Sequence, residues 1–416
     1  MALTSDSIIL DKLFIRMRII IIDLHCNDFF VRHMARIMAN NRIMSFKHQF
    51  LLRYFLENNY EVYNLITNSG TTALFPFSRF TSHSHFCKKL ESFYVERKNN
   101  LPIIKTISIK DIKPTDIVIA FLVKPYQIPF IESLTCYKMV CGNHFISIAK
   151  PVDLDKGDIN AFVNEIDLSN NKFVNRYINK KKCDDITLPY VFANRFEVRK
   201  PFAERENKAM AVGTASTCEG INGDYDLYRE FFHTNLIQLM RWEILEKKDE
   251  VKEWIDCYIG DIRSGAVKER VPKGFIDKII WKFQSQKLSN QSDYTSFDMV
   301  ETFNKYKMFT CPEELVGMPG IGAIEGIACG TPNIGIKHEM YDSLGLKPGV
   351  HYIAYDGTLE DMVKVIKEYQ EKPLELEKIA QSGCEYVRSH FNEKAVLETF
   401  IKQLNNSYHK YLNKYN

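Results

Sequence analysis

Residues 306–336 read YKMFTCPEELVGMPGIGAIEGIACGTPNIGI, and this stretch decides the fold that we predict. The apolar run at 306–311 predicts a short buried strand, and residues 333–336 predict the next one. Between them lie a glycine-rich loop and a short apolar segment. This order predicts a strand–helix–strand unit of a parallel sheet, with a glycine-rich entrance to its helix.

The segment between the two strands predicts the helix of that unit. The helix should begin near Gly322, and its apolar side chains recur at the spacing that places them on one face: Ile324, Ile327 and Ala328. Gly330 stands where a capping glycine follows a helix, and Pro332 cannot continue one. One face of this helix is therefore expected to pack on a sheet.

The entrance to the helix suits a diphosphate that lies next to a diol. Glycines let the backbone approach a ligand, and free N–H groups at a helix start favour phosphate. Glu325 lies one turn inside the helix, and helical side chains lean toward the N-terminus. A carboxylate repels phosphate, but it can accept hydrogen bonds from a diol such as ribose. The residues thus predict a nucleotide-diphosphate site, and the alternative is an ordinary βαβ unit with a solvent-facing Glu325.

Residues 325–332, EGIACGTP, resemble the E-A-M-A-C-G-T-P signature of GT-B glycosyltransferases, especially the large retaining family 4. The resemblance implies that Glu325 binds the ribose of a nucleotide-diphosphate sugar and belongs to the catalytic site. It also implies that Gly320, Ile321 and Gly322 contact this donor through their backbone. No metal or other cofactor is expected at such a donor site.

The chain departs from this family at one position of the signature. The family usually carries a second glutamate eight residues before the one at Glu325, and this chain has Gly317 there. Glu313 and Glu314 lie close by in the sequence, and Glu314 is our candidate for a contact with the donor sugar or the acceptor. The departure leaves the donor sugar open, and also the choice between retaining and inverting transfer.

Length and composition favour a two-domain globular protein of the cytoplasm. The chain has 416 residues, 45% of them hydrophobic, and its net charge of +3 is too small to predict nucleic acid as a main ligand. Its 10 cysteines include no CxxC pair, so we expect reduced thiols and no zinc site. No apolar run approaches the roughly 20 residues of a membrane helix, and the first residues do not read as a signal peptide. We therefore expect a cytoplasmic protein that at most contacts the inner face of the cell membrane.

The resemblance also predicts the fold class and the division into domains. The expected fold is α/β of the GT-B class, with two Rossmann-like domains that face each other across a cleft and a C-terminal helix that crosses back to the first domain. The predicted limits are an N-terminal extension at 1–16, the first domain at 17–195, a linker at 196–206, the second domain at 207–390 and the crossing helix at 391–416. Within the linker, residues 200–201 and the charged residues at 204–206 are expected to be exposed.

Polar residues follow the first predicted strand of the first domain. The apolar run at 17–23 ends in Asp23, and His25 comes directly after it. Ligands of α/β sheets bind at the carboxyl ends of strands, so Asp23 and His25 are candidate contacts with the acceptor or the donor sugar. An ordinary polar loop between a strand and a helix explains the same residues.

His144 follows a later strand, predicted at 137–141, within the segment GNHF. In GT-B enzymes a histidine at the end of such a strand often faces the donor sugar, so the resemblance implies a catalytic role for His144, by position more than by motif. The alternative is a structural histidine. Further along the chain, Glu165 is a candidate for a contact with an acceptor hydroxyl.

Residues 209–214, AMAVGT, predict the first strand and turn of the second domain, with Gly213 and Thr214 as further donor contacts. Family 4 enzymes often carry Arg and Lys just after this turn to hold the phosphates, but residues 214–220 contain neither. Another cation must then balance the negative charge of the diphosphate, or backbone N–H groups must bind the diphosphate without one. The sequence offers three candidates without ranking them: Arg263, Lys268 and Lys287.

Residues 225–290 predict mostly helices. Within them, residues 273–287 read KGFIDKIIWKFQSQK and place large apolar side chains on one helix face with lysines around it. Such a helix either packs in a core or lies on an anionic membrane, and the second reading would suit a lipid-linked acceptor.

Two D-x-D segments, at 153–155 and 224–226, resemble the metal motif of GT-A glycosyltransferases. Three residues with two fixed positions arise easily by chance, and neither segment is followed by the organisation of a GT-A domain. We therefore interpret both as acids of ordinary turns.

The sequence as a whole predicts a glycosyltransferase that moves a sugar from a nucleotide-diphosphate sugar to a glycan or glycolipid of surface polysaccharide synthesis, such as capsule or lipopolysaccharide. Two rivals stay open. Gly317 and the missing basic residues would also fit a non-catalytic scaffold subunit, and a sugar-nucleotide epimerase shares the same fold class. Turnover without an acceptor would favour the epimerase, and no turnover at all would favour the scaffold.

Overall fold

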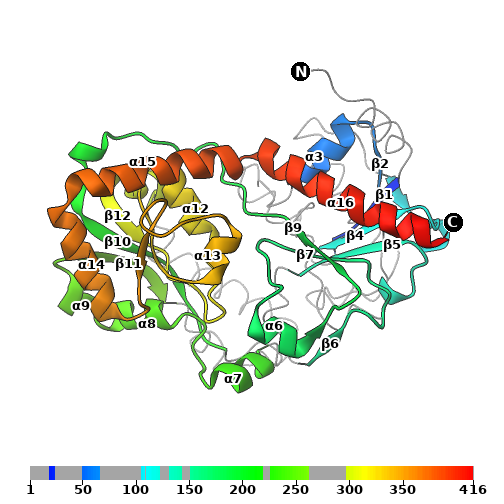
Figure 1. The fold of residues 1–416 in the computed structure, drawn as a ribbon, viewed down its shortest axis with the longest axis horizontal. Coiled ribbons are helices and arrows are strands. Elements are labelled where there is room, and N and C mark those ends of the chain that lie inside the picture. Colours follow the sequence, from blue (N-terminus) through cyan, green and yellow to red (C-terminus); the bar gives the residue numbers. More distant parts are fainter. Residues whose placement is uncertain are drawn as a thin grey trace, which may run out of the picture.

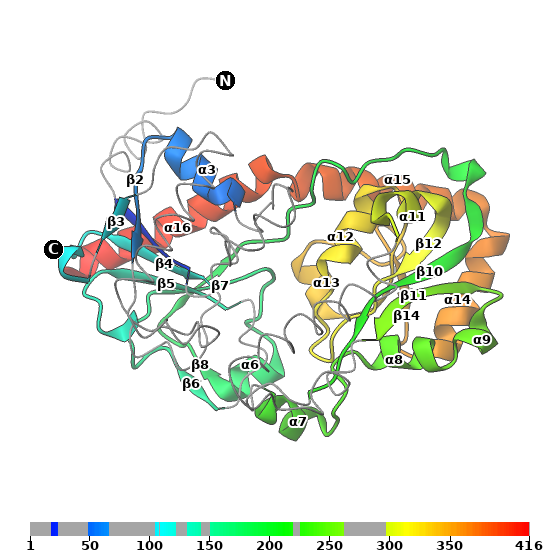
Figure 2. The ribbon, with the colours of Figure 1, turned by 180° about the vertical axis from the view of Figure 1, so that it is seen from behind.

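The structure is a computed structural model that describes residues 18–23, 49–65, 105–107, 109–121, 131–142, 150–218, 225–261 and 297–415. It consists of two α/β domains that lie side by side, as Figure 1 shows. An extended linker and two long C-terminal helices connect the domains, and both connections are visible from behind in Figure 2. The predicted α/β class is confirmed, with two domains that are each built on a parallel sheet.

A seven-stranded parallel sheet forms the first domain, in the order β3-β2-β1-β4-β5-β7-β9. Its strands are β1 (Arg18–Asp23), β2 (Glu61–Leu65), β3 (Lys105–Ile107), β4 (Ile117–Phe121), β5 (Tyr137–Cys141), β7 (Ala161–Asn164) and β9 (Asp184–Thr187). The strand order reverses between β1 and β4, which places the switch point of this sheet, where α/β folds bind ligands, at the carboxyl ends of these two strands.

Both faces of this sheet are covered, which explains the continuous apolar runs in its central strands β1 and β4. Ile20 and Ile22 of β1 belong to one buried cluster, and Ile19 and Ile21 belong to the cluster on the opposite face. Two helices cover that second face, namely α3 (Gln49–Glu57) and the last helix, α16 (Glu393–Tyr415). The predicted crossing of the last helix back onto the first domain is therefore confirmed (Figure 1).

The second domain contains a parallel sheet in the order β11-β10-β12, and a bridge between Phe309 and Asn333 joins it to the parallel pair β13-β14. The strands are β10 (Glu206–Ala215), β11 (Ile255–Asp261), β12 (Tyr306–Thr310), β13 (Ile334–Ile336) and β14 (Ile353–Tyr355). The helices are α7 (Asp226–Phe232), α8 (Leu239–Glu246), α9 (Lys248–Val251), α11 (Met299–Lys305), α12 (Ile321–Ala328), α13 (Glu339–Ser343), α14 (Leu359–Glu371) and α15 (Pro373–His390). The strand order reverses between β10 and β12, so this sheet also has a switch point.

The predicted strand–helix–strand unit consists of β12, α12 and β13. Its expected apolar face is buried, with Ile324 and Ala328 fully covered. Gly326 is required for this packing, because a Cβ there would lie 2.3 Å from the Phe309 ring. Gly330 follows the C-cap of the helix with a φ of +71°, a conformation that glycine adopts without strain.

The prediction of mostly helices at 225–290 was wrong in one part, because residues 255–261 form strand β11. Ile255 and Ile259 are buried in this strand, which pairs in parallel with β10, and the three residues between them are half-buried. The helix predicted at 273–287 lies outside the described residues.

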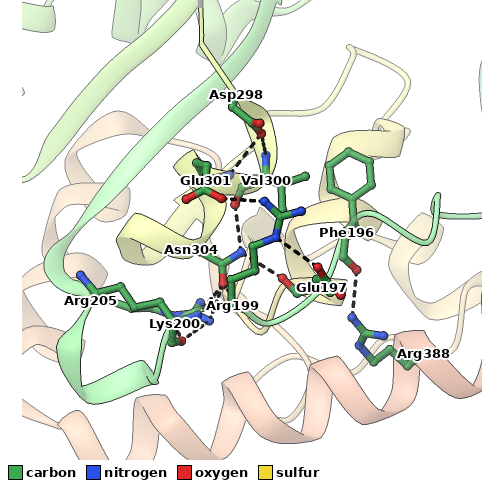
Figure 3. A network of polar contacts seen from close by, with 10 residues as sticks. All are labelled: Phe196, Glu197, Arg199, Lys200, Arg205, Asp298, Val300, Glu301, Asn304 and Arg388. Carbon is green, nitrogen blue, oxygen red and sulfur yellow. Dashed lines mark hydrogen bonds and ion pairs between the residues drawn. The ribbon is translucent and has the colours of Figure 1, made fainter.

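Most residues of the linker between the domains are exposed, and hydrogen bonds also tie the linker to the second domain. The side-chain oxygen of Asn304 accepts hydrogen bonds from the backbone N–H groups of Arg199 at 2.7 Å and Lys200 at 3.2 Å. Arg205 is buried, and its guanidinium donates to the carbonyl of Gly330 at 3.0 Å. Figure 3 shows this network on α11 and α15. The limits of the domains stay predictions.

A second contact between the domains involves a short helix of the first domain, α6 (Lys172–Tyr177), beside the two-residue strands β6 (Val152–Asp153) and β8 (Ile178–Asn179). Phe173 of α6 packs edge-on against Tyr228 of α7, with 5.7 Å between ring centroids. Asn171, the N-cap of α6, donates to the carbonyl of Val316 at 3.4 Å. In the part of the chain that the structure describes, no helix is both long enough and apolar enough to cross a membrane.

Candidate functional site

The candidate site lies at the N-terminal end of α12, beside the switch point of the second domain. Gly320 is the N-cap of this helix and has an extended backbone, with no side chain to cap it. The N–H of Ala323 donates to the carbonyl of Gly320 at 3.0 Å, whereas no acceptor among the described residues receives the N–H groups of Ile321 and Gly322. These two donors leave the helix end free to bind an anion.

Glu325 lies one turn further along α12 and is half-buried. No described residue donates a hydrogen bond to its carboxyl group. Burial raises the pKa of this group to about 7, and the charge of Arg195, in the segment that leaves the first domain, only partly opposes the rise. When this half-buried group is ionised, it has no hydrogen-bond donor among the described residues, and the two hydroxyls of a ribose would supply such donors.

Gly317 stands where the family has a glutamate, and the side chain of another residue occupies the space beside it. Its φ is +81°, and a Cβ there would lie 2.4 Å from the imidazole of His338. The Nδ1 of His338 accepts a hydrogen bond from the N–H of Met340 at 3.2 Å, which caps α13. His338 therefore lies against the place of the missing glutamate, and sequence reasoning did not find it because no sequence pattern links His338 to Gly317.

The two glutamates near Gly317 have different environments. Glu313 is buried and accepts hydrogen bonds from the Tyr341 hydroxyl and from the N–H of Ile336, the latter at 3.2 Å, so it serves the fold. Glu314 accepts only one recorded hydrogen bond, from Gln238 at 3.4 Å. Of these two, Glu314 is the one that remains a candidate for a substrate contact.

Glu314 and Glu165 come from different domains, and the charge of Glu165 affects the pKa of Glu314. Glu165 is buried directly after β7, the strand that ends at Asn164. Burial raises the pKa of Glu314, the charge of Arg241 and the hydrogen bond from Gln238 oppose the rise, and the charge of Glu165 adds to it. Tyr190 is near both, because burial followed by the charges of Glu165 and Glu314 raises the pKa of its hydroxyl. The structure thus brings two sequence-predicted residues of opposite domains close to one tyrosine that the sequence analysis did not single out.

Gly213 and Thr214 belong to strand β10, whereas the sequence placed the turn there. Gly213 has a φ of +127°, and a Cβ at this position would lie 2.9 Å from the guanidinium of Arg241. Arg241 comes from α8 and is buried, and its Nη1 donates to the carbonyl of Thr214 at 3.0 Å. Sequence reasoning missed this residue. The available signal was a single arginine between the apolar Met240 and Trp242 of a helix.

Several predicted residues cannot be placed. Asp23 is the last residue of β1, at the switch point of the first sheet, and its side chain lies outside what the structure describes. The following predicted residues also lie outside the described part of the chain: His25, His144, Arg263, Lys268 and Lys287.

The first D-x-D segment consists of turn acids, as predicted. Asp153 accepts a hydrogen bond from the N–H of Lys156 at 3.1 Å, and Asp155 accepts one from the N–H of Lys182 at 2.8 Å. Of the second segment, Asp226 starts helix α7. Among the residues that the structure describes, no three His, Cys, Asp or Glu side chains gather as metal ligands would.

The class defined by this fold and site is a two-domain α/β protein with an open helix N-terminus at the switch point of its second sheet. Residues 274–402 match the protein-family model described as "Glycosyl transferase-like". The matched range contains residues 325–332 and confirms the resemblance that they suggested. Comparison with curated protein sequences gave no significant match.

Three solved structures are similar to nearly the whole chain. Sucrose-phosphate synthase from Thermosynechococcus elongatus has a TM-score of 0.47 and 10% identity, and the alignment covers 96% of this chain and 100% of that one. Anabaena HepE, in complex with UDP and glucose, has a TM-score of 0.44 and 10% identity, with coverage of 94% and 100%. A glycosyltransferase from Rickettsia africae ESF-5 has a TM-score of 0.44 and 12% identity, with coverage of 95% and 99%.

Proposed function

We propose that this protein transfers a sugar from a nucleotide-diphosphate sugar to a glycan or glycolipid acceptor in the synthesis of a surface polysaccharide, such as capsule or lipopolysaccharide. Its glycosyl transferase-like second domain supports the reaction type. The transfer requires no metal at the donor site, and retention of configuration is the outcome that the signature at 325–332 favours. The reaction takes place in the cytoplasm, with peripheral contact to the membrane where the acceptor is lipid-linked.

The observation that carries this proposal is the unbonded carboxyl of Glu325 beside the free N–H groups of Ile321 and Gly322. In the proposed complex the two helix N–H groups bind the diphosphate, and Glu325 accepts hydrogen bonds from the ribose. Departure of the nucleoside diphosphate develops negative charge, which the helix end stabilises without rearrangement. A single helix turn therefore holds both chemical features of the donor.

The acceptor is proposed to bind between the two domains. Glu165 and Glu314 approach the same space from opposite sides, and Tyr190 is near both. We assign these carboxylates to contacts with hydroxyls of the acceptor or the donor sugar, together with Asp23, His25 and the catalytic candidate His144. Holding both sugars in one geometry replaces a bimolecular encounter with an oriented reaction.

The test is nucleotide binding by Glu325→Gln. We expect calorimetry with UDP and GDP to find one that binds the unmodified chain, and we expect the variant to bind it about 10- to 100-fold more weakly, because a charge-assisted hydrogen bond is lost. The matched control is Glu360→Gln, an exposed glutamate in the first turn of α14, and it should bind as the unmodified chain does. Equal affinity of the folded Glu325→Gln protein and the unmodified chain would remove Glu325 from the site.

A further inference from the structure

Arg241 is a buried cation without a counter-ion. Its side chain is only 7% exposed. Its Nε donates to the carbonyl of Pro312 at 2.7 Å and its Nη1 to the carbonyl of Thr214 at 3.0 Å. Among the described residues, no carboxylate oxygen lies within 4.0 Å of the guanidinium, the limit for an ion pair. The guanidinium is therefore fixed in place by neutral partners, and it forms no ion pair with the two glutamates whose pKa its charge lowers, Glu313 and Glu314.

The charge of Arg241 opposes the rise in the pKa of the nearest acidic residues, Glu313 and Glu314, but their carboxyl groups are hydrogen-bonded to other residues. The carboxylate of Glu313 is occupied by Tyr341 and by the N–H of Ile336. Glu314 accepts its recorded hydrogen bond from Gln238. An unpaired buried charge costs several kcal/mol, so a charge retained in such a place is expected to meet an anion from outside the chain.

The guanidinium spans the switch point of the second sheet. Thr214 is near the end of β10, and Pro312 follows the end of β12. The remaining N–H groups of Nη2 have the Cys311 sulfur at 3.9 Å as their one recorded neighbour. The Nη2 atom of Arg241 faces Gly320, because a Cβ added to Gly320 would lie 3.7 Å from it. The uncommitted donors thus face the N-cap of α12.

Two independent sources of positive potential therefore meet at one place. One is the start of α12, with the free N–H groups of Ile321 and Gly322. The other is Arg241, which reaches the same helix start from α8 on the far side of β10 and β12. An α/β sheet binds its ligands at this point, and a guanidinium suits the paired oxygens of a phosphate.

We propose that Arg241 is the cation that binds the diphosphate of the nucleotide substrate. The proposal rests on the proposed function, because it assigns a residue to the same donor site. It also names the positive charge that residues 214–220 lack. The alternative is a structural role, in which Arg241 only ties β10 to the loop after β12.

Inorganic pyrophosphate is the probe that tests this proposal, because its binding does not depend on the nucleotide base. Binding to the full chain is measured by calorimetry for the unmodified protein and for Arg241→Gln, together with UDP, GDP and their nucleosides. We expect Arg241→Gln to weaken pyrophosphate and nucleoside-diphosphate binding about 10- to 100-fold, and to leave nucleoside binding unchanged. If Arg241 is purely structural, its substitution should lower the melting temperature and leave the ratio of diphosphate affinity to nucleoside affinity unchanged.

The matched control is Arg388→Gln at the opposite end of α12. Arg388 also donates two hydrogen bonds to backbone carbonyls, from Nε to Ala328 at 3.1 Å and from Nη2 to Phe196 at 2.9 Å. This variant should be destabilised to a similar degree and should bind pyrophosphate normally. Arg241→Lys keeps a point charge and loses the planar fork, so we expect it to fold and to bind pyrophosphate several-fold more weakly than the unmodified chain.

The outcomes separate the two proposals. If the unmodified chain binds pyrophosphate or a nucleoside diphosphate and Arg241→Gln binds it equally well, the assignment of Arg241 is wrong and the proposed function stands. If Arg241→Gln does not fold, equal binding by Arg241→Lys and the unmodified chain has the same meaning. If the unmodified chain binds neither pyrophosphate nor any nucleoside diphosphate, the proposed function fails, and the assignment of Arg241 fails with it.

Discussion

The two ends of helix α12 differ in how completely their polar groups are bonded. At the C-terminal end, the carbonyl of Ala328 accepts a hydrogen bond from Arg388 at 3.1 Å, and the carbonyls of Cys329 and Gly330 accept bonds from Arg205 at 2.9 and 3.0 Å. At the N-terminal end, two N–H groups, the Glu325 carboxyl and part of the Arg241 guanidinium have no bonded partner among the described residues. The N-terminal end is also the more exposed of the two, so it is the end that a ligand can reach.

This contrast predicts that changes at the C-terminal end cost stability and that changes at the N-terminal end cost binding. The largest stability effect is expected for Arg205→Met. The variant leaves the carbonyls of Cys329 and Gly330 without their donor and removes a bond to the Thr331 hydroxyl, made at 2.7 Å. We expect the free energy of unfolding to fall by about 2–4 kcal/mol in urea titrations, with unchanged nucleotide affinity in the folded fraction.

Arg199→Met is the control for that variant. Arg199 forms ion pairs with Glu197 and Glu301 on the surface of the same linker. Because exposed ion pairs contribute little, the change should cost less than about 1 kcal/mol. Equal losses for the two variants would contradict the view that Arg205 holds the end of α12.

The next effect is expected in the middle of the helix, from Gly326→Ala. The added Cβ would lie 2.3 Å from the Phe309 ring and 2.7 Å from the Phe303 ring, so α12 must move away from β12. We expect a loss of about 1–3 kcal/mol in the same urea titrations. Gly322→Ala is the comparison on the same helix, where the Cβ meets the Cys311 sulfur at 3.1 Å and alanine favours the helix. A larger loss at Gly322 than at Gly326 would show that the packing of α12 on β12 is not the sensitive contact.

The smallest effect is a pH dependence at the open end. The pKa of Glu325 is raised from 4.5 to about 7 in the folded chain, so the folded state holds a proton that the unfolded state loses between these two pH values. Stability therefore falls as the pH rises from about 4.5 to 7, by about 1–2 kcal/mol after allowance for partial exposure, and the cost persists at higher pH. Glu325→Gln removes the cost and should be the more stable protein at pH 8, with no difference at pH 4.

Nucleotide binding should show the opposite dependence on pH. Ribose hydroxyls donate best to an ionised carboxylate, so affinity for the bound nucleotide should increase as the pH rises through about 7. Melting curves and calorimetry at pH 5, 6, 7 and 8 measure both trends on the same samples. A flat stability difference between the unmodified chain and Glu325→Gln across this range would mean that the carboxyl titrates normally.

Much of the fold could be predicted from the sequence, because its signals are local. The apolar spacing of Ile324, Ile327 and Ala328 and the glycine at 330 define α12 and its end within a few turns of chain. The buried run at residues 18–22 predicted a parallel strand in the same way. Strand β11 was missed, since an apolar segment between helices has no local mark that separates a strand from another helix.

Other features depend on residues that are distant in the sequence. Arg205 was predicted to lie in an exposed linker, but its acceptors are 124 and 125 residues away, and only the packed second domain brings them together. The imidazole of His338 fills the space beside Gly317 for the same reason. No pattern within a window of the sequence contains such pairs.

The candidate site shows the same division. By itself, the sequence determined the glycine-rich entrance, the carboxylate of Glu325 and the absence of basic residues at 214–220. Only the tertiary structure decided which cation faces that entrance, because the acceptors of Arg241 are 27 and 71 residues away from it, at the ends of two strands. The distance between two charges follows from how helices pack on a sheet, and this packing depends on the whole domain.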